Sequence, residues 1–197
     1  FDGLFSGLEI LSRVKPLFFE SLAIVSNGLG PALMAKNNLV QKNGALADLA
    51  SVFEQPHLGE DLWYHEEVGN NPVILPPNAS AEEYKEILQQ LDRTKNLGAI
   101  LLIHTPNKRS KSEDLAKELE PVIRRCRHMV LTIWLGNETV QEARQLFDES
   151  GLLNFDTPSE ATDAFMIMVH HERNQRSLNE TPPSQRASAT ASPRGSR

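Results

Sequence analysis

The chain has 197 residues and a formal net charge of −6, with 40% hydrophobic residues, 23% charged residues and one cysteine. These values are typical of one globular domain of ordinary size. The acidic balance argues against nucleic acid as a partner, and a single cysteine excludes an internal disulfide or a cysteine-based zinc cluster within one chain. No apolar run approaches the ~20 residues that cross a bilayer. We therefore expect no membrane span and a cytoplasmic location.

The two ends of the chain differ from its middle. Residues 1–15 have leucines on one helical face, which indicates an amphipathic helix that leads in from a preceding domain. The last residues, SQRASATASPRGSR, contain three arginines, no acid and no large apolar residue, so they cannot bury enough surface to fold. We divide the chain into this leading helix, one domain (16–178) and a disordered linker or cloning remnant (179–197). Because the sequence starts at Phe1, we expect a piece of a longer protein.

Between these ends, short apolar runs alternate with stretches of helical periodicity. Continuous apolar runs of this length are typical of strands that are buried on both faces of a parallel sheet. The predicted strands are Ser21–Ser26, Leu97–His104, Met129–Trp134, a shorter one near Asn154–Phe155, and a short one at Val73–Leu75 within the otherwise loop-like, proline-rich stretch Glu54–Pro77.

Start and stop signals place helices between these strands. They include a proline in a first turn, capping boxes and a terminal glycine. The predicted helices are Pro31–Lys42, a helix capped by Ser80 with Glu83, Ser112–Arg125, a helix from the cap Asn137 to Gly151, and one opened by Thr157-Pro158-Ser159-Glu160 that runs through AFMIMVHHERNQ. This alternation predicts a three-layer α/β/α domain with a flavodoxin-like, parallel, five-stranded sheet, whose strand C-termini share one edge.

The sharpest local feature is the glycine-rich loop after the first strand. Glycines let the backbone approach a ligand closely, and the free N–H groups of a helix start attract anions. The backbones of Asn27, Gly28, Leu29 and Gly30 are therefore candidates for binding phosphate or a phosphoryl group. The loop matches neither a complete GxGxxG fingerprint nor a Walker loop. Glycines that serve only strand-to-helix packing remain the alternative.

Two later loops end at the same edge of the predicted sheet. They supply His104, Thr105, Gly136 and Asn137 as second-loop contacts. An imidazole at a strand end could contact a phosphoryl group or transfer a proton, but without a neighbouring acid a structural histidine is the alternative. No GxSxG, CxxC or HExxH motif occurs, and we assign no catalytic residue and no metal ligand.

Four segments resemble one domain of the NDP-forming acyl-CoA synthetase superfamily, the succinyl-CoA-ligase-like flavodoxin-type domain. They are SNGLGPALMAKNNL, NNPVILPPNASAEEY, LLIHTP and EARQLFDESGLLNFDTPSEATDAFMIMVHHERNQRSL. They occur in the superfamily's order, and the resemblance covers about residues 1–183. It is strongest to bacterial protein lysine acetyltransferases of the Pat type, in which a synthetase-like half is fused to a GNAT-class acetyltransferase domain.

The resemblance implies a ligand for the glycine-rich loop. In that superfamily the helix after the loop points its N-terminus at a phosphohistidine carried by another domain, so by position the backbone from Asn27 to Gly30 would face that anion. The chain departs from the pattern in NPVIL, where related sequences read Asn-Pro-Leu-Asp-Leu. Ile74 in place of the acid argues against synthetase activity and agrees with a synthetase half that senses a ligand.

The resemblance also implies what a longer parent protein would contain. CoA-binding and ATP-grasp domains are the expected partners, with a GNAT domain in an acetyltransferase. CoA or acetyl-CoA, and ATP or ADP with Mg, would be the parent's cofactors, whereas we expect the isolated chain to bind none and to catalyse no reaction.

Three functions remain open at this point. The chain is a regulatory module of a protein N-acetyltransferase that binds acetyl-CoA or phosphate together with its neighbours, or the phosphoryl-stabilising domain of an active ADP-forming acyl-CoA synthetase. The third alternative is a stand-alone interaction domain that has kept the fold and lost the ligand.

Overall fold

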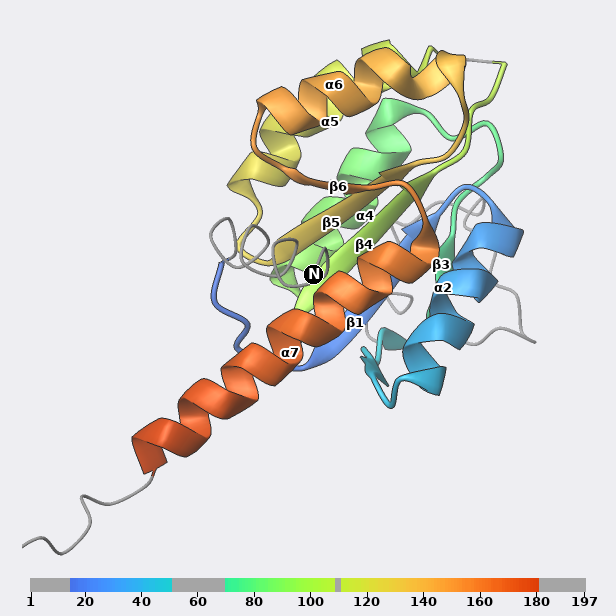
Figure 1. The fold of residues 1–197 in the computed structure, drawn as a ribbon. Coiled ribbons are helices and arrows are strands. Elements are labelled where there is room, and N and C mark those ends of the chain that lie inside the picture. The colour runs from blue at the N-terminus through green and yellow to red at the C-terminus, as the bar shows by residue number, and fades with distance from the viewer. Residues whose placement is uncertain (1–14, 51–69, 109–110, 181–197) are drawn as a thin grey trace, which may run out of the picture.

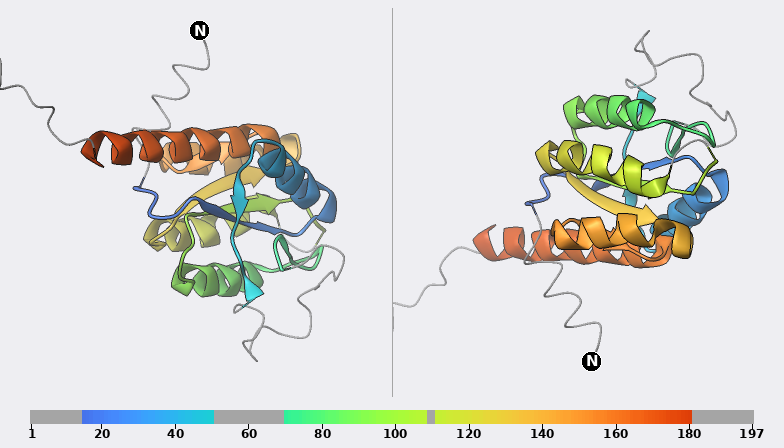
Figure 2. Two further views of the ribbon diagram at one scale, coloured as in Figure 1. Left: turned by 90° about the horizontal axis from the view of Figure 1, so that it is seen from below. Right: turned by 90° about the horizontal axis from the view of Figure 1, so that it is seen from above.

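The structure, a computed structural model, describes residues 15–50, 70–108 and 111–180. A parallel sheet lies at its centre with helices on both faces (Figures 1 and 2). The predicted three-layer, flavodoxin-like fold is therefore confirmed. The predicted leading helix lies outside the described residues except for Lys15, and the predicted linker except for Asn179 and Glu180, which end the last helix. No described helix is long and apolar enough to cross a membrane.

The elements follow one another in βα order. They are β1 (Ser21–Ser26), α2 (Leu29–Gln41), β2 (Ala45–Leu46), β3 (Val73–Ile74), α4 (Ala81–Arg93), β4 (Ala99–His104), α5 (Ser112–Arg125), β5 (Met129–Trp134), the 3-10 turn η1 (Glu138–Val140), α6 (Gln141–Glu149), β6 (Leu153–Phe155) and α7 (Pro158–Glu180).

The sheet has the order β2-β1-β4-β5-β6, and all its pairings are parallel. β2 pairs with the start of β1 and β3 with its end, so these two short strands share one edge position. The predicted five positions thus hold six strands, because the edge strand is interrupted between Leu46 and Val73. The sequence does not predict β2, since two residues are too few for a periodic pattern.

The side chain of Asn71 bridges the interruption in this edge strand. Its Oδ1 accepts a hydrogen bond from the Ile24 N–H at 3.0 Å, and its Nδ2 donates to the carbonyls of Leu22 and Ala47, each at 2.9 Å. Asn71 is only 4% exposed, so water does not replace these bonds. A side-chain amide therefore takes the place of a backbone peptide in the ladder.

Two apolar clusters, one on each face of the sheet, hold the three layers together. α4 and α5 lie on one face, and α2 and α7 lie side by side on the other (Figure 2). α6 belongs to the same apolar cluster as α4 and α5. The buried residues of α4 recur at three- and four-residue spacing from Tyr84 to Leu91, which is the stripe of an amphipathic helix. Every residue of β4 and β5 is buried, as expected for parallel strands covered on both faces.

Several predicted element bounds are confirmed. β1, α5 and β5 begin and end where the sequence predicts them. The capping box before α4 is present, since the Glu83 N–H donates to Ser80 Oγ at 3.4 Å and the Ser80 N–H donates to Glu83 Oε2 at 2.6 Å. At the start of α7, Thr157 Oγ1 accepts from the Glu160 N–H at 3.2 Å.

Other helix ends differ from the prediction. α2 begins at Leu29 rather than Pro31, because the extended Gly28 serves as its N-cap and a proline fits anywhere in a first turn, where an N–H has no intrahelical partner. The predicted cap at Asn137 is wrong: its side chain makes no capping bond, and a 3-10 turn precedes α6. α7 continues past its predicted end and projects beyond the sheet (Figure 1).

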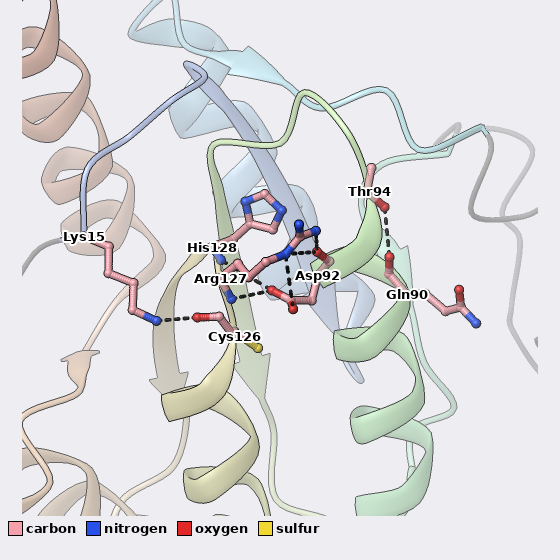
Figure 3. A network of polar contacts seen from close by, with 7 residues as sticks. All are labelled: Lys15, Gln90, Asp92, Thr94, Cys126, Arg127 and His128. Atoms are coloured by element: carbon pink, nitrogen blue, oxygen red, sulfur yellow. Dashed lines mark hydrogen bonds and ion pairs between the residues drawn. The ribbon is translucent and has the colours of Figure 1, made fainter.

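A polar network at the amino edge of the sheet joins the end of α4 to the turn before β5 (Figure 3). The Asp92 carboxylate accepts from the Arg127 N–H at 2.6 Å, and Arg127 Nε donates to the Asp92 carbonyl at 3.1 Å. Lys15 Nζ donates to the carbonyl of Cys126. Burial raises the pKa of the Cys126 thiol to about 11, so the thiol stays protonated and is a poor nucleophile.

Candidate anion site at the carboxyl edge of the sheet

The side chain of Asn27 fixes the loop after β1. Its Nδ2 donates to the carbonyls of Thr105 at 2.8 Å and Pro77 at 3.1 Å, and its Oδ1 accepts from the Thr105 N–H at 2.7 Å and the Thr105 hydroxyl at 2.9 Å. Asn27 is 2% exposed. One buried amide therefore joins the loops that follow β1, β3 and β4, and its hydrogen bonds hold them in a single arrangement.

The N-terminus of α2, which follows this loop, carries no capping side chain. Its first turn contains no acid, whereas the first turns of α4, α5, α6 and α7 each contain at least one. The Gly28 N–H donates to Ser26 Oγ at 3.0 Å, and Pro31 has no N–H. Within residues 15–50, 70–108 and 111–180, no acceptor takes the N–H of Leu29 or Gly30. These two amides lie at the positive end of the helix dipole, where an anion is stabilised.

The two glycines of the loop differ in their surroundings. A Cβ at Gly28 would lie 3.0 Å from Thr105 Cγ2, whereas a Cβ at Gly30 would meet nothing within 4 Å. Packing against the β4 loop therefore accounts for Gly28 but not for Gly30. A glycine in a helix costs ~1 kcal/mol relative to alanine, and the open space before Gly30 leaves room for a ligand or a neighbouring domain.

His104 lies inside the domain, beneath the loops. It is 1% exposed, with Nδ1 3.2 Å from the Tyr84 hydroxyl and Nε2 3.3 Å from the Ser112 hydroxyl, and its ring centroid is 5.0 Å from that of Trp134. Burial lowers the pKa of His104 from 6.5 to about 4, so the imidazole is neutral near pH 7. Both ring nitrogens are engaged, which favours the structural alternative for His104 over contact with a phosphoryl group.

The other second-loop candidates lie in two separate places. Thr105 binds Asn27 directly and belongs to the glycine-rich loop's surroundings. Gly136 and Asn137 follow β5, where Gly136 has a φ of +134° and lies against Pro106. No hydrogen bond among the described residues joins Gly136 or Asn137 to the loop that precedes α2.

A hollow of about 570 Å³ opens between the β4–α5 and β5–η1 loops. Contacts with Glu142 and Lys117 lower the pKa of Glu113, and contact with Glu113 raises the pKa of Glu142. The wall is mixed in charge and does not include the glycine-rich loop. It consists of Pro106, Asn107, Lys108, Lys111, Ser112, Glu113, Glu138, Thr139 and Glu142.

The sequence does not identify three buried polar residues that lie near the loops. Tyr84 lies on the apolar stripe of α4 and is typical of a core residue, Ser112 is typical of a helix start, and Asn71 lies in a stretch predicted as loop. Their partners lie on other elements, so spacing along the chain gives no signal for them. In the part of the chain that the structure describes, no group of three or more His, Cys, Asp or Glu residues could hold a metal ion.

The chain is similar to ADP-forming acetate–CoA ligase I of Archaeoglobus fulgidus, with 29% identity over 153 residues. The match covers 78% of this chain and 21% of the ligase. No protein-family model matches the chain.

Solved structures share its fold. The dinucleotide-forming acetyl-coenzyme A synthetase 1 of Ca. Korarchaeum cryptofilum, in complex with phosphate and ADP, superposes with a TM-score of 0.75 at 15% identity, over 91% of this chain and 39% of the synthetase. PH0766 of Pyrococcus horikoshii superposes with a TM-score of 0.71 at 18% identity, over 85% of this chain and 40% of PH0766.

The chain thus spans about a fifth of the ligase and about two fifths of the solved chains. At these identities the superpositions establish a common fold, and the ligase adds a similarity of sequence. The chain is thus similar in sequence to one part of an ADP-forming acetate–CoA ligase, and similar in fold to one part of an acetyl-coenzyme A synthetase.

Proposed function

We propose that this domain binds a phosphate or phosphoryl group at the N-terminus of α2, as a ligand-sensing module of a larger acyl-CoA-handling protein. The observation that carries the proposal is the pair of open amides at Leu29 and Gly30, on a helix start without a cap or an acid. An anion at this position would accept two backbone hydrogen bonds and meet the helix dipole. The loop is already fixed through Asn27, so binding would require little reordering.

A sensing rather than catalytic role is supported by Ile74. The residue is 4% exposed and belongs to the apolar cluster beneath α2 and α7, so no acid stands at this point of the sheet edge. Among the described residues no group of three or more His, Cys, Asp or Glu residues could hold a metal ion, and the one cysteine, Cys126, is buried. We infer that the domain recognises a phosphate-bearing ligand and leaves turnover to other domains.

The parent protein that we propose is a protein lysine acetyltransferase of the kind that the sequence resembles. CoA-binding, ATP-grasp and GNAT domains would be its other parts, and acetyl-CoA its acyl donor. The test is acetyl transfer from acetyl-CoA to lysines of metabolic enzymes such as acyl-CoA synthetases by the full-length protein. We expect acetylated lysine in the products, and its absence with every such substrate would contradict this parent.

The similarity to an ADP-forming acetate–CoA ligase favours a second candidate. In an active synthetase the same two amides would stabilise a phosphoryl group carried by another domain. This candidate predicts ATP formation from acetyl-CoA, ADP and phosphate by the full-length protein. Zero turnover would exclude it and leave the sensing role.

The binding site itself is tested by adding inorganic phosphate to the ¹⁵N-labelled 197-residue chain. We expect the largest amide shift changes at Leu29 and Gly30, with saturation, and only small changes at the start of α5, whose first turn contains Glu113 and Asp114. Chloride at matched ionic strength serves as the control. Shift changes spread over many parts of the chain, or none at all, would contradict the proposal.

A further inference from the structure

A buried polar cluster lies beneath the candidate phosphate loop, and one of its members, Tyr84, also contacts the backbone of Asn27. It consists of Tyr84 on α4, His104 at the end of β4 and Ser112 at the start of α5, which are 0%, 1% and 4% exposed. The three residues come from three elements that converge at the carboxyl edge of the sheet. Each hydrogen bond in the cluster therefore constrains the position of one element relative to another.

The hydrogen bonds of the cluster fix the imidazole in one orientation. A neutral imidazole has one donor and one acceptor nitrogen, and both have a hydroxyl partner, at 3.2 Å on the Tyr84 side and 3.3 Å on the Ser112 side. The Trp134 ring covers the imidazole at a centroid distance of 5.0 Å. His104 can thus neither rotate nor shift without losing a bond that buried groups cannot replace with water.

Thr105, the residue after His104, connects the end of β4 to the loop that precedes α2. The Thr105 N–H, carbonyl and hydroxyl make three of the four hydrogen bonds of the Asn27 side chain. Asn27 directly precedes Gly28, the N-cap of α2. A displacement at the end of β4 would therefore move the residues from which the amides of Leu29 and Gly30 project.

We propose that His104 is a positioning residue for the phosphate loop: held by Tyr84 and Ser112, it sets the Thr105 peptide that Asn27 binds, and so the direction of the open amides of α2. This inference rests on the proposed function, which it deepens. Apolar side chains of similar volume in place of all three residues can be nearly neutral in stability, so we attribute the buried polar cluster to the geometry that it specifies.

The test compares two variants that each remove one hydroxyl with a control that removes a hydroxyl elsewhere in the sheet. Ser112→Ala and Tyr84→Phe each leave one nitrogen of His104 unpaired. Tyr84→Phe also removes the hydroxyl that contacts the Asn27 backbone, so Ser112→Ala is the variant that isolates the contribution of His104. Thr132→Val removes a similarly buried hydroxyl, which donates to the Leu153 carbonyl at 3.0 Å away from the loop. Ser112→Thr keeps the hydroxyl, and the adjoining hollow offers room for its methyl group.

The first readout is amide hydrogen exchange in the 197-residue chain without phosphate. After correction for the change in global stability, we expect the Thr105 N–H to exchange about tenfold faster in Ser112→Ala and Tyr84→Phe, the equivalent of one lost hydrogen bond. Thr132→Val should leave its exchange unchanged, and Ser112→Thr should restore it. Equal acceleration in Thr132→Val, or none in the two hydroxyl deletions, would overturn the inference.

The second readout separates this inference from the proposed function. If the unmodified chain binds inorganic phosphate at Leu29 and Gly30, Ser112→Ala and Tyr84→Phe should weaken that binding by about tenfold and Thr132→Val should not. Equal affinities in all four variants would overturn the positioning role while leaving the phosphate site intact. If the unmodified chain binds no phosphate, the proposed function fails, and the exchange measurement alone decides whether His104 positions the loop.

Discussion

The side chain of Asn71 holds the interrupted edge of the sheet through three buried hydrogen bonds. Replacing Asn71 by alanine leaves the Ile24 N–H and the Ala47 carbonyl without their partner in the buried edge of the sheet. We expect a loss of about 2–4 kcal/mol in the free energy of unfolding, measured with urea, because buried groups would remain unsatisfied.

The neighbouring asparagine provides the matched control for this prediction. Asn70 makes an exposed hydrogen bond to Asp48 Oδ1 at 2.9 Å, so Asn70→Ala should cost less than about 1 kcal/mol. Equal losses for the two variants would show that the Asn71 amide does not replace a backbone peptide in the ladder.

His104 makes stability depend on pH. Burial lowers its pKa from 6.5 to about 4, so between these pH values the unfolded chain binds more protons than the folded chain. Its contribution is complete above pH 6.5 and is lost as the pH falls towards 4, by about 3 kcal/mol at that pH. We expect His104→Gln to flatten the dependence of unfolding free energy on pH over this interval, measured with urea.

A second histidine controls for the general effect of acid on the chain. His170 is exposed on α7, so His170→Gln should change the slope between pH 6.5 and 4 less than His104→Gln does. The buried neutral imidazole would be disproved if His104→Gln and the unmodified chain lost stability in parallel.

At the scale of the residue, the sequence identifies what is unusual but not what it touches. It singles out His104 and the glycine-rich loop, because a histidine and clustered glycines at strand ends stand out from an apolar pattern. Tyr84 and Ser112, which hold His104, are separated from it by a helix and by a loop. Their pairing depends on how β4, α4 and α5 pack, which one sequence does not reveal.

At the scale of the element, two glycines should respond in opposite ways to alanine. Gly30→Ala places a methyl group in open space on α2 and should raise the free energy of unfolding by about 0.5–1 kcal/mol through helix propensity. Gly98→Ala places a Cβ 2.1 Å from the Phe19 carbonyl oxygen and should lower it by at least ~2 kcal/mol, because backbone must move. Urea unfolding measures both, and the same sign for both would contradict the packing described here.

The start of α4 depends on its capping box. Ser80→Ala removes the acceptor for the Glu83 N–H and should cost about 1 kcal/mol. Ser80→Asp keeps an acceptor oxygen at the N-cap and should retain most of that stability. Thermal unfolding separates these outcomes, and no difference between alanine and aspartate would mean that the box adds nothing to the fold.

Elements with strong local signals are the ones that the sequence predicts well. β1, α5 and β5 combine continuous apolar runs or periodic stripes with clear ends, and their bounds agree with the structure. β2 has only two residues, and it is a strand because it pairs with the start of β1. The prediction that Asn137 caps α6 is wrong because a 3-10 turn precedes this helix. Tertiary packing determines this turn, and the local sequence does not predict it.

At the scale of the whole molecule, the alternation of strands and helices suffices to predict the layered fold. The exact number of strands does not follow, since the broken edge is repaired by one side chain from a proline-rich loop. The sequence predicts where the candidate site lies, at the carboxyl edge of the sheet after β1. It does not predict which backbone N–H groups are free to bind a ligand. The Gly28 N–H is taken by Ser26 Oγ, a bond that leaves the next two amides open.

The central claim is that the Leu29 and Gly30 amides bind phosphate, and one pair of variants tests it most directly. Leu29→Pro removes one of the two donors while keeping the helix, because proline suits the first helical position and Gly28 before it is extended. Leu29→Ala keeps the N–H and removes only the side chain. The measurement is calorimetric titration of the 197-residue chain with inorganic phosphate.

We predict that Leu29→Pro binds phosphate at least about tenfold more weakly than Leu29→Ala, which should match the unmodified chain. Far-UV circular dichroism should confirm that both variants keep the helix content of the unmodified chain. Equal phosphate affinity in the proline and alanine variants would contradict the account, because the anion would then not be held by the start of α2.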